Sequence, residues 1–192
     1  MREPRIFTQD FYYHLIAKGN NQDIFVHKWD FDSFLRNLSK YSKKFLVKIL
    51  AFVLMPNHVH LLVKQTSVAS LSKFMQVLTT SYANYFNLRY KRSGHLFQGR
   101  FKHVPVDTDE YLLHLSRYIH LNPTNSALVK RPENYVWSSF RCYLGLDKLD
   151  FIDKKTILDY FGKKGPVKDY QEFVDSRIDY QREINLQKLL LE

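Results

Sequence analysis

The chain has 192 residues, of which 45% are hydrophobic and 16% aromatic, so it is long and apolar enough for one sizeable packed domain and is not a disordered chain. Lys and Arg number 29 against 19 Asp and Glu, and the resulting formal charge of +10 favours a polyanionic partner such as nucleic acid. The single cysteine, Cys142, excludes an internal disulfide framework and a multi-cysteine zinc site, and we expect it in the core.

We expect a soluble, cytoplasmic protein. The first residues are charged and no apolar run follows them, which argues against a secretory signal. The longest apolar stretch, residues 49–55, has the length of a strand and not of a membrane span.

Hydrophobic periodicity predicts alternating strands and helices along the first two thirds of the chain. In order, the pattern predicts a strand over 11–17, a helix over 30–44, strands over 45–54 and 58–64, a helix over about 70–90, an extended basic segment over 96–106, and a helix from 107 that Pro123 ends. Two short charged helices, 154–161 and 168–180, should follow around Gly165-Pro166.

This order is the split β-α-β pattern of ferredoxin-like folds. It predicts an α+β protein with one antiparallel sheet and helices on one face of it. Residues 1–145 should form the main domain, and residues 146–192 a charged helical extension.

His58 and His60 lie two residues apart on the predicted strand after the Pro56-Asn57 turn. Alternation along a strand sends both imidazoles to the same face, where they could share a divalent ion. Taken alone, the pair is better explained as two strand histidines that bind nothing, because it lacks a third ligand.

Tyr118 and Asn122 are four residues apart on a predicted helix and therefore project from one face. A phenol and an amide oxygen therefore reach the same place, and an amide oxygen is a fair ligand for Mg²⁺ or Mn²⁺. The simpler alternative is that Tyr118 packs in the core and Asn122 caps the helix.

A stretch in which cations alternate with aromatic residues, 89–103, is typical of single-strand nucleic-acid binding, where cations contact phosphates and bases stack on rings. The alternative is a solvated charged hairpin. The candidate DNA-binding residues, together with the arginine that precedes Tyr118, are Arg89, Lys91, Arg92, His95, Phe97, Gln98, Arg100, Lys102 and Arg117.

Several segments, in this order, resemble the REP-associated tyrosine transposases, which belong to the single-tyrosine HUH transposases of insertion sequences. The matching segments, within roughly residues 5–145, are Gly19-Asn20-Asn21, Leu54-Met55-Pro56-Asn57-His58-Val59-His60-Leu61-Leu62, Gly94-His95-Leu96-Phe97-Gln98-Gly99-Arg100-Phe101-Lys102, Leu115-Ser116-Arg117-Tyr118-Ile119-His120-Leu121-Asn122-Pro123 and Tyr135-Val136-Trp137-Ser138-Ser139. A series of ordered segments is far more specific than any one of them.

The resemblance implies a prokaryotic, DNA-associated enzyme that cuts and rejoins single-stranded or hairpin DNA, as a monomer or a homodimer. His58 and His60 match the metal ligands of the family, Asn122 matches its third ligand, and Tyr118 matches the nucleophile that forms a 5′-phosphotyrosine. The implied cofactor is Mg²⁺ or Mn²⁺. Residues 1–145 would then be the HUH catalytic domain.

The chain departs from the family pattern just after the tyrosine helix. Asn125 stands where the family has arginine, and Ala127 stands where it has glycine. Neither is a ligand or a nucleophile, so cleavage chemistry need not be lost. Two other functions remain open: a relative that binds hairpin DNA without strand transfer, and an unrelated metallohydrolase, which would need a general base near His58.

Overall fold

The computed structural model describes residues 7–67 and 71–178. Its elements are β1 (Tyr12–Lys18), α1 (Lys28–Lys44), β2 (Val47–Met55), β3 (His58–Gln65), α2 (Leu71–Arg89), β4 (Lys102–Val106), α3 (Asp109–Asn125), the 3-10 turn η1 (Pro132–Asn134), α4 (Phe140–Tyr143), α5 (Lys155–Leu158) and α6 (Pro166–Asp175). Within the described ranges, no helix is both long and apolar enough to cross a membrane.

The four strands form one antiparallel sheet in the order β2-β3-β1-β4. Pro56 and Asn57 join β2 and β3 as a tight hairpin, as their turn chemistry predicts. Each helix of the split pattern links strands that are not consecutive neighbours, which gives the expected ferredoxin-like order. The predicted α+β class is therefore confirmed.

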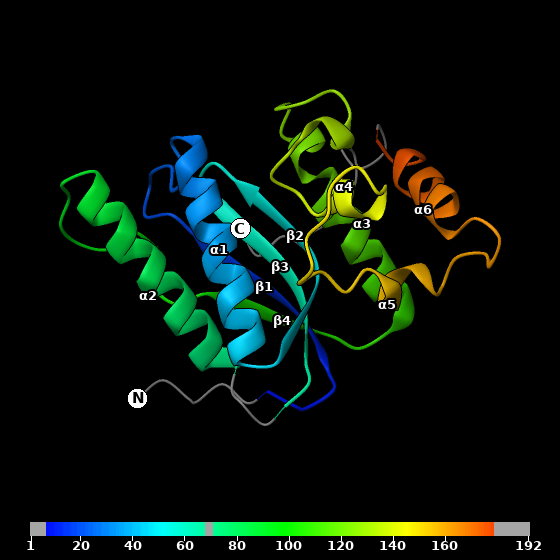
Figure 1. Ribbon diagram of the computed structural model, residues 1–192, viewed down its shortest axis with the longest axis horizontal. Helices are drawn as coiled ribbons and strands as arrows, with labels where there is room; N and C mark the ends of the chain where they lie inside the picture. Colours follow the sequence, from blue (N-terminus) through cyan, green and yellow to red (C-terminus); the bar gives the residue numbers. More distant parts are fainter. Residues whose placement is uncertain (1–6, 68–70, 179–192) are drawn as a thin grey trace.

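Helices cover both faces of this sheet, as Figure 1 shows. The apolar residues Leu15, Phe52 and Leu61 face α1 and α2 in one core, whereas Leu50 and Leu62 face α3 in a second core. The expectation of helices on one face therefore holds only for α1 and α2. The reason lies in β2, which is buried on both faces and accordingly reads as an unbroken apolar run instead of an alternating one.

Only part of the predicted extended segment 96–106 is a strand. Lys102–Val106 pairs with β1, while residues 94–101 form an arm that is tied to the end of β1 by an isolated bridge between Gly19 and Phe97. The helix expected from about residue 70 is α2, which begins at Leu71. Ser70 lies outside the described residues. The last predicted helix is α6, which ends at Asp175, and the part of that prediction beyond 178 lies outside the described residues.

The prediction that Pro123 ends the tyrosine helix is wrong, because α3 continues to Asn125. Proline removes one backbone donor and so weakens a helix without always stopping it. Here the last turn is held by tertiary packing: Leu121, Asn122, Pro123 and Thr124 are all buried. Burial of this turn outweighs the missing hydrogen bond.

Helix α3 ends in a Schellman motif. The Leu128 amide donates to the Pro123 carbonyl at 2.9 Å, and the Ala127 amide donates to the Thr124 carbonyl at 3.0 Å. Ala127 must adopt a left-handed conformation, with φ of 56°, to close the motif. This geometry explains why a glycine suits the position better than the alanine of this chain.

Replacing Ala127 with glycine is expected to raise the free energy of unfolding by about 1 kcal/mol, because glycine adopts a left-handed conformation without steric cost. Urea denaturation followed by circular dichroism measures the change. The control is Ser126→Gly: Ser126 has φ of −85°, so glycine there should give no gain. An equal stabilisation by both variants would contradict this explanation.

Candidate active site

The histidine pair lies on the face of the sheet that α3 covers. In the sheet register His60 is opposite Ile16 and His58 is opposite Lys18, so both imidazoles project from the end of the β1–β3 ladder. Gly19 fixes this end: its amide donates to the Asn57 carbonyl at 2.7 Å. A Cβ at Gly19 would lie 2.4 Å from the Gln22 carbonyl oxygen, so only glycine permits the approach.

Hydrogen bonds on the far side of each ring orient the two histidines. His58 Nδ1 lies 2.6 Å from Asn57 Oδ1, and His60 Nδ1 lies 2.9 Å from His14 Nε2. The rings of His58 and His60 are perpendicular, with centroids 4.8 Å apart. In both residues the Nδ1 atom is thus engaged, and Nε2 is the atom that could bind a metal.

Burial keeps the inner histidines neutral. Desolvation lowers the pKa of His60 well below its ordinary value, with His14 and His58 lowering it further. Desolvation also lowers the pKa of His14 to about 3. A neutral imidazole has a lone pair to give to a metal ion, whereas a protonated one does not.

Helix α3 places the Tyr118 ring against the rings of His60 and His14. The Tyr118 ring meets the His60 ring edge-on at a centroid separation of 5.6 Å, and the His14 ring at 6.4 Å. Tyr118 retains only 3% of its surface exposed. A DNA phosphodiester would therefore reach its hydroxyl through a narrow opening or after a shift of α3.

Asn122 lies one helical turn after Tyr118 and is buried, with 6% of its surface exposed. Residues four apart share a helix face, so its side chain projects toward the same region as the tyrosine. The two strand histidines and the two helix residues all belong to one chain.

The donor set suits a divalent metal ion. Among the described residues, His60 Nε2 is buried without a hydrogen-bond partner, a state that a metal bond would relieve. The described part of the chain has no cluster of three or more His, Cys, Asp or Glu residues that could hold a metal. The amide oxygen of Asn122 is of a type that suits a divalent ion as a further ligand.

Arg117 is buried instead of facing a DNA surface. Its guanidinium stacks on the Phe173 ring of α6 at 4.2 Å from the centroid and donates to the Phe173 carbonyl at 3.4 Å. The Nη2 atom of Arg117 lies 2.8 Å from His114 Nδ1. In this structure Arg117 packs the extension onto α3.

A buried polar network also joins α6 to the tyrosine helix. The Tyr170 hydroxyl lies 2.7 Å from His120 Nδ1 and donates to Ser116 Oγ at 3.1 Å. His120 Nε2 in turn lies 2.8 Å from Ser139 Oγ. The division at residue 145 stays a prediction, but Ile157, Tyr170 and Val174, which lie beyond it, share the second core with α3.

Replacing Tyr170 with phenylalanine is expected to lower the free energy of unfolding by about 1–3 kcal/mol, because His120 Nδ1 would remain buried without its partner. Thermal and urea denaturation measure the loss. Tyr160→Phe, at a residue of the same extension that is 45% exposed, is the control and should change little. Equal stability of both variants would mean that the network does not hold α6 in place.

The predicted basic segment divides into two parts. Arg89 and Arg92 lie near the end of α2, where Arg89 is 3.9 Å from the buried Asp30 and Arg92 stacks on Phe86. Lys91 and His95 are exposed nearby. Both arginines are therefore partly engaged within the protein.

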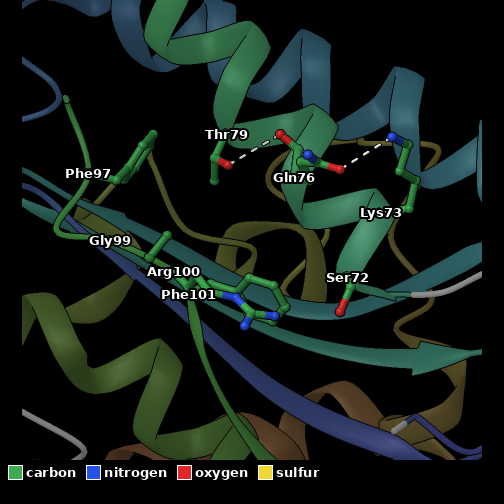
Figure 2. Close-up of a pocket in the computed structure, with 9 residues that line it drawn as sticks. Ser72, Lys73, Gln76, Thr79, Phe97, Gly99, Arg100 and Phe101 are labelled. Atoms are coloured by element: carbon green, nitrogen blue, oxygen red, sulfur yellow. Dashed lines mark hydrogen bonds between the residues drawn. The ribbon is translucent and has the colours of Figure 1, made fainter. Parts of the chain in front are cut away.

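The second part lies at the β1–β4 edge of the sheet. Lys102 pairs with Ile16, so its exposed side chain is on the same face as His60. The Gln98 side chain is exposed, and the Gln98 backbone amide donates to the Lys18 carbonyl at 2.8 Å. The half-buried Phe97 and the exposed Arg100 line a pocket on the opposite face (Figure 2).

His14 is the site residue that sequence reasoning missed. It is fully buried and contacts both His60 and Tyr118. A signal existed, since a histidine in a run of strand formers is unusual inside a core unless a partner is present. Its partner, however, is 46 residues away and could be found only from the sheet register.

Comparison with known proteins gives the family. Residues 7–122, more than half of the chain, match the model of the IS200-like transposases. No curated protein matches. The chain belongs to the IS200-like transposase family, and the resemblance seen in its motifs is confirmed at that level.

Solved structures support the fold. The structure of a REP-associated tyrosine transposase bound to a REP hairpin is similar over 80% of this chain and 97% of that one, with a TM-score of 0.65 and 14% identity. A candidate transposase from Deinococcus radiodurans is similar over 62% of this chain and 95% of that one, with 20% identity and a TM-score of 0.44. The first of these structures has the same fold as this chain.

Proposed function

We propose that this IS200-like transposase cleaves and rejoins single-stranded, hairpin-containing DNA through a covalent 5′-phosphotyrosine at Tyr118. His58, His60 and Asn122 would hold a divalent ion, Mg²⁺ or Mn²⁺. The observation that carries the proposal is the edge-on contact between the Tyr118 ring and the His60 ring, 5.6 Å between centroids, in one chain. The contact supports the proposal because it is between the ring of the candidate nucleophile and one candidate metal ligand, His60.

The ligand atoms follow from the hydrogen bonds. For His60 Nε2 to have a free lone pair, Nδ1 must carry the proton and donate to His14 Nε2. His58 would use its Nε2 likewise, with Nδ1 donating to Asn57. When bound, the ion would polarise the scissile phosphate and neutralise part of its charge.

Tyr118 would supply the nucleophile. Its oxygen attacks the phosphorus in line with the 3′ oxygen of the neighbouring nucleotide, the new O–P bond forms, and the bond to the 3′ oxygen breaks. The phenol loses its proton and the 3′ oxygen leaves as a hydroxyl. Because a phosphodiester replaces a phosphodiester, a 3′ hydroxyl can attack in reverse and rejoin strands without an external energy source.

The exposed side chains beside the histidine face fit a DNA backbone. Lys102 lies on that face of β4, and Lys18 is the register partner of His58. Cations at this edge would lower the repulsion between successive phosphates as a strand enters the site. The similar fold of a transposase bound to a REP hairpin supports a hairpin substrate.

The test is incubation of the purified chain with labelled single-stranded DNA hairpins, resolved on a denaturing gel. We expect a protein-linked DNA band that protease removes, that requires Mg²⁺ or Mn²⁺, and that EDTA prevents. Binding without any such band over a broad hairpin library would favour the DNA-binding relative without strand transfer. Cleavage without a covalent intermediate would instead favour a metal-activated water.

His14 should act as a positioning residue for His60. Replacing it with phenylalanine keeps a ring of similar size but removes the acceptor for His60 Nδ1, and we expect Mn²⁺ affinity to fall about 10–100-fold. Calorimetry or paramagnetic resonance of Mn²⁺ binding measures this without DNA. Unchanged affinity in a folded His14→Phe protein would remove His14 from the site.

A further inference from the structure

Helix α6, in the extension beyond residue 145, packs against the helix that carries Tyr118. Figure 1 shows α3 between the sheet and α6, and α3 contacts β2, β3 and α6. The family match ends at residue 122, so α6 lies outside the matched residues. The contacts that α6 makes with α3 therefore come from a part of the chain that the family pattern does not describe.

One chain of hydrogen bonds joins β2, α3 and α6. The Phe52 backbone amide donates to Ser139 Oγ at 2.8 Å, and Ser139 Oγ lies 2.8 Å from His120 Nε2. His120 Nδ1 lies 2.7 Å from the Tyr170 hydroxyl, which donates to Ser116 Oγ at 3.1 Å. The four side chains are fully buried, so water cannot replace a bond that is lost.

These contacts hold the side of α3 that is opposite to the nucleophile. Successive residues of a helix are about 100° apart, so Ser116 and His120, each two residues from Tyr118, project from nearly the opposite side. Arg117 projects from the flank and stacks on the Phe173 ring, 4.2 Å from its centroid. Helix α6 thus holds the back and one flank of α3, while the Tyr118 ring lies against the sheet histidines.

The rotation of α3 about its axis decides where the Tyr118 hydroxyl lies. The oxygen is at the end of a long side chain, so a small rotation of the helix moves it further than the backbone. Attack requires reacting atoms about 3–3.5 Å apart, and a misplacement of about 1 Å can lower a rate about 100-fold. Hydrogen bonds are directional, so a chain of them resists rotation more than ring packing does.

We propose that Tyr170 and Phe173 are positioning residues for the reaction: from α6 they fix the rotation of α3 and thereby the aim of the Tyr118 hydroxyl at the scissile phosphate. The inference rests on the proposed function, because it takes Tyr118 as the nucleophile. It makes α6 part of the catalytic unit. Both residues act on the side of α3 away from the metal ligands, so their loss slows the attack without changing DNA or Mn²⁺ affinity.

The first test separates the rate of adduct formation from stability. Tyr170→Phe breaks the chain of hydrogen bonds, and Phe173→Leu removes the ring under Arg117. With saturating hairpin DNA and Mn²⁺, below the unfolding temperature of every variant, each should lower the rate constant about tenfold and leave the half-saturating concentrations unchanged. Val174→Ala is the control: it removes fully buried apolar atoms of α6, so it should lower stability and keep the wild-type rate.

Fluorine NMR measures the position of the Tyr118 ring without DNA or cleavage. With 3-fluorotyrosine incorporated in place of Tyr118, the fluorine chemical shift reports the surroundings of the ring, and broadening by Mn²⁺ reports its distance from the ion. We expect Tyr170→Phe and Phe173→Leu to change both the shift and the broadening. Val174→Ala should change neither.

Two results would overturn the inference: rate losses that follow stability equally in Val174→Ala, or a fluorine shift that is unchanged in both Tyr170→Phe and Phe173→Leu. Failure of the proposed function has a different signature. The wild-type protein itself would then form no adduct, or Mn²⁺ would leave its fluorine signal unbroadened. The chemical shift measured without Mn²⁺ tests the positioning of the ring in that case as well.

Discussion

A Tyr118→Phe protein is expected to fold and to bind hairpin DNA but to form no covalent adduct. The substitution removes one oxygen, the proposed nucleophile, and keeps the ring that packs against His60 and His14. Loss of a hydroxyl in such a setting changes stability by about 1 kcal/mol. The adduct on a denaturing gel should fall below detection, at least about 1,000-fold, since no other group takes the place of an absent nucleophile.

The matched control is Tyr111→Phe, which removes a phenol oxygen from the same helix. Tyr111 is half-buried near the start of α3, about two turns before Tyr118, and should leave adduct formation unchanged. An adduct that survives in Tyr118→Phe would assign the nucleophile to another residue. Loss in both variants would point to a general effect on α3.

Replacing His60 with alanine is expected to reduce metal binding and adduct formation together. The variant removes the buried Nε2 atom that the proposal assigns to the ion, and charge stabilisation by a metal contributes several kcal/mol to such reactions. We expect adduct formation at a fixed Mn²⁺ concentration to fall about 100-fold or more, which corresponds to about 3 kcal/mol. Excess Mn²⁺ should restore part of it.

Mn²⁺ titration distinguishes this loss from that of Tyr118→Phe, which should keep wild-type metal affinity. His27→Ala, at an exposed histidine before α1, is the control for removing an imidazole. A circular dichroism melt must accompany the assay, because His14 loses its partner in the variant. A folded His60→Ala protein with wild-type Mn²⁺ affinity would exclude the proposed ion site.

The elements that local patterns specify were predictable from the sequence. Alternation placed His58 and His60 on one face of a strand, and helical spacing placed Tyr118 and Asn122 on one face of a helix, and the structure has both arrangements on the expected elements. The end of the tyrosine helix was predicted wrongly, because it depends on tertiary packing. Pro123 was expected to end α3, but burial of the last turn carries the helix past it.

Contacts between distant segments were beyond local reasoning. Arg117 precedes the tyrosine and has the chemistry of a phosphate contact, yet Phe173, 56 residues later, covers it. His14 reaches His60 only because β1 lies beside β3. The unbroken apolar run of β2, by contrast, is visible in the sequence, and a sheet covered on both faces could have been predicted from it in place of helices on one face.

The most direct measurement is mass spectrometry of the covalent complex. Wild-type protein is incubated with a hairpin and Mn²⁺, then digested with protease and nuclease, and the peptides are searched for a nucleotide joined through its 5′ phosphate. We predict the modification on the peptide that contains Tyr118, and on that residue. Cut DNA without any modified peptide, or with the nucleotide on another residue, would contradict the tyrosine mechanism.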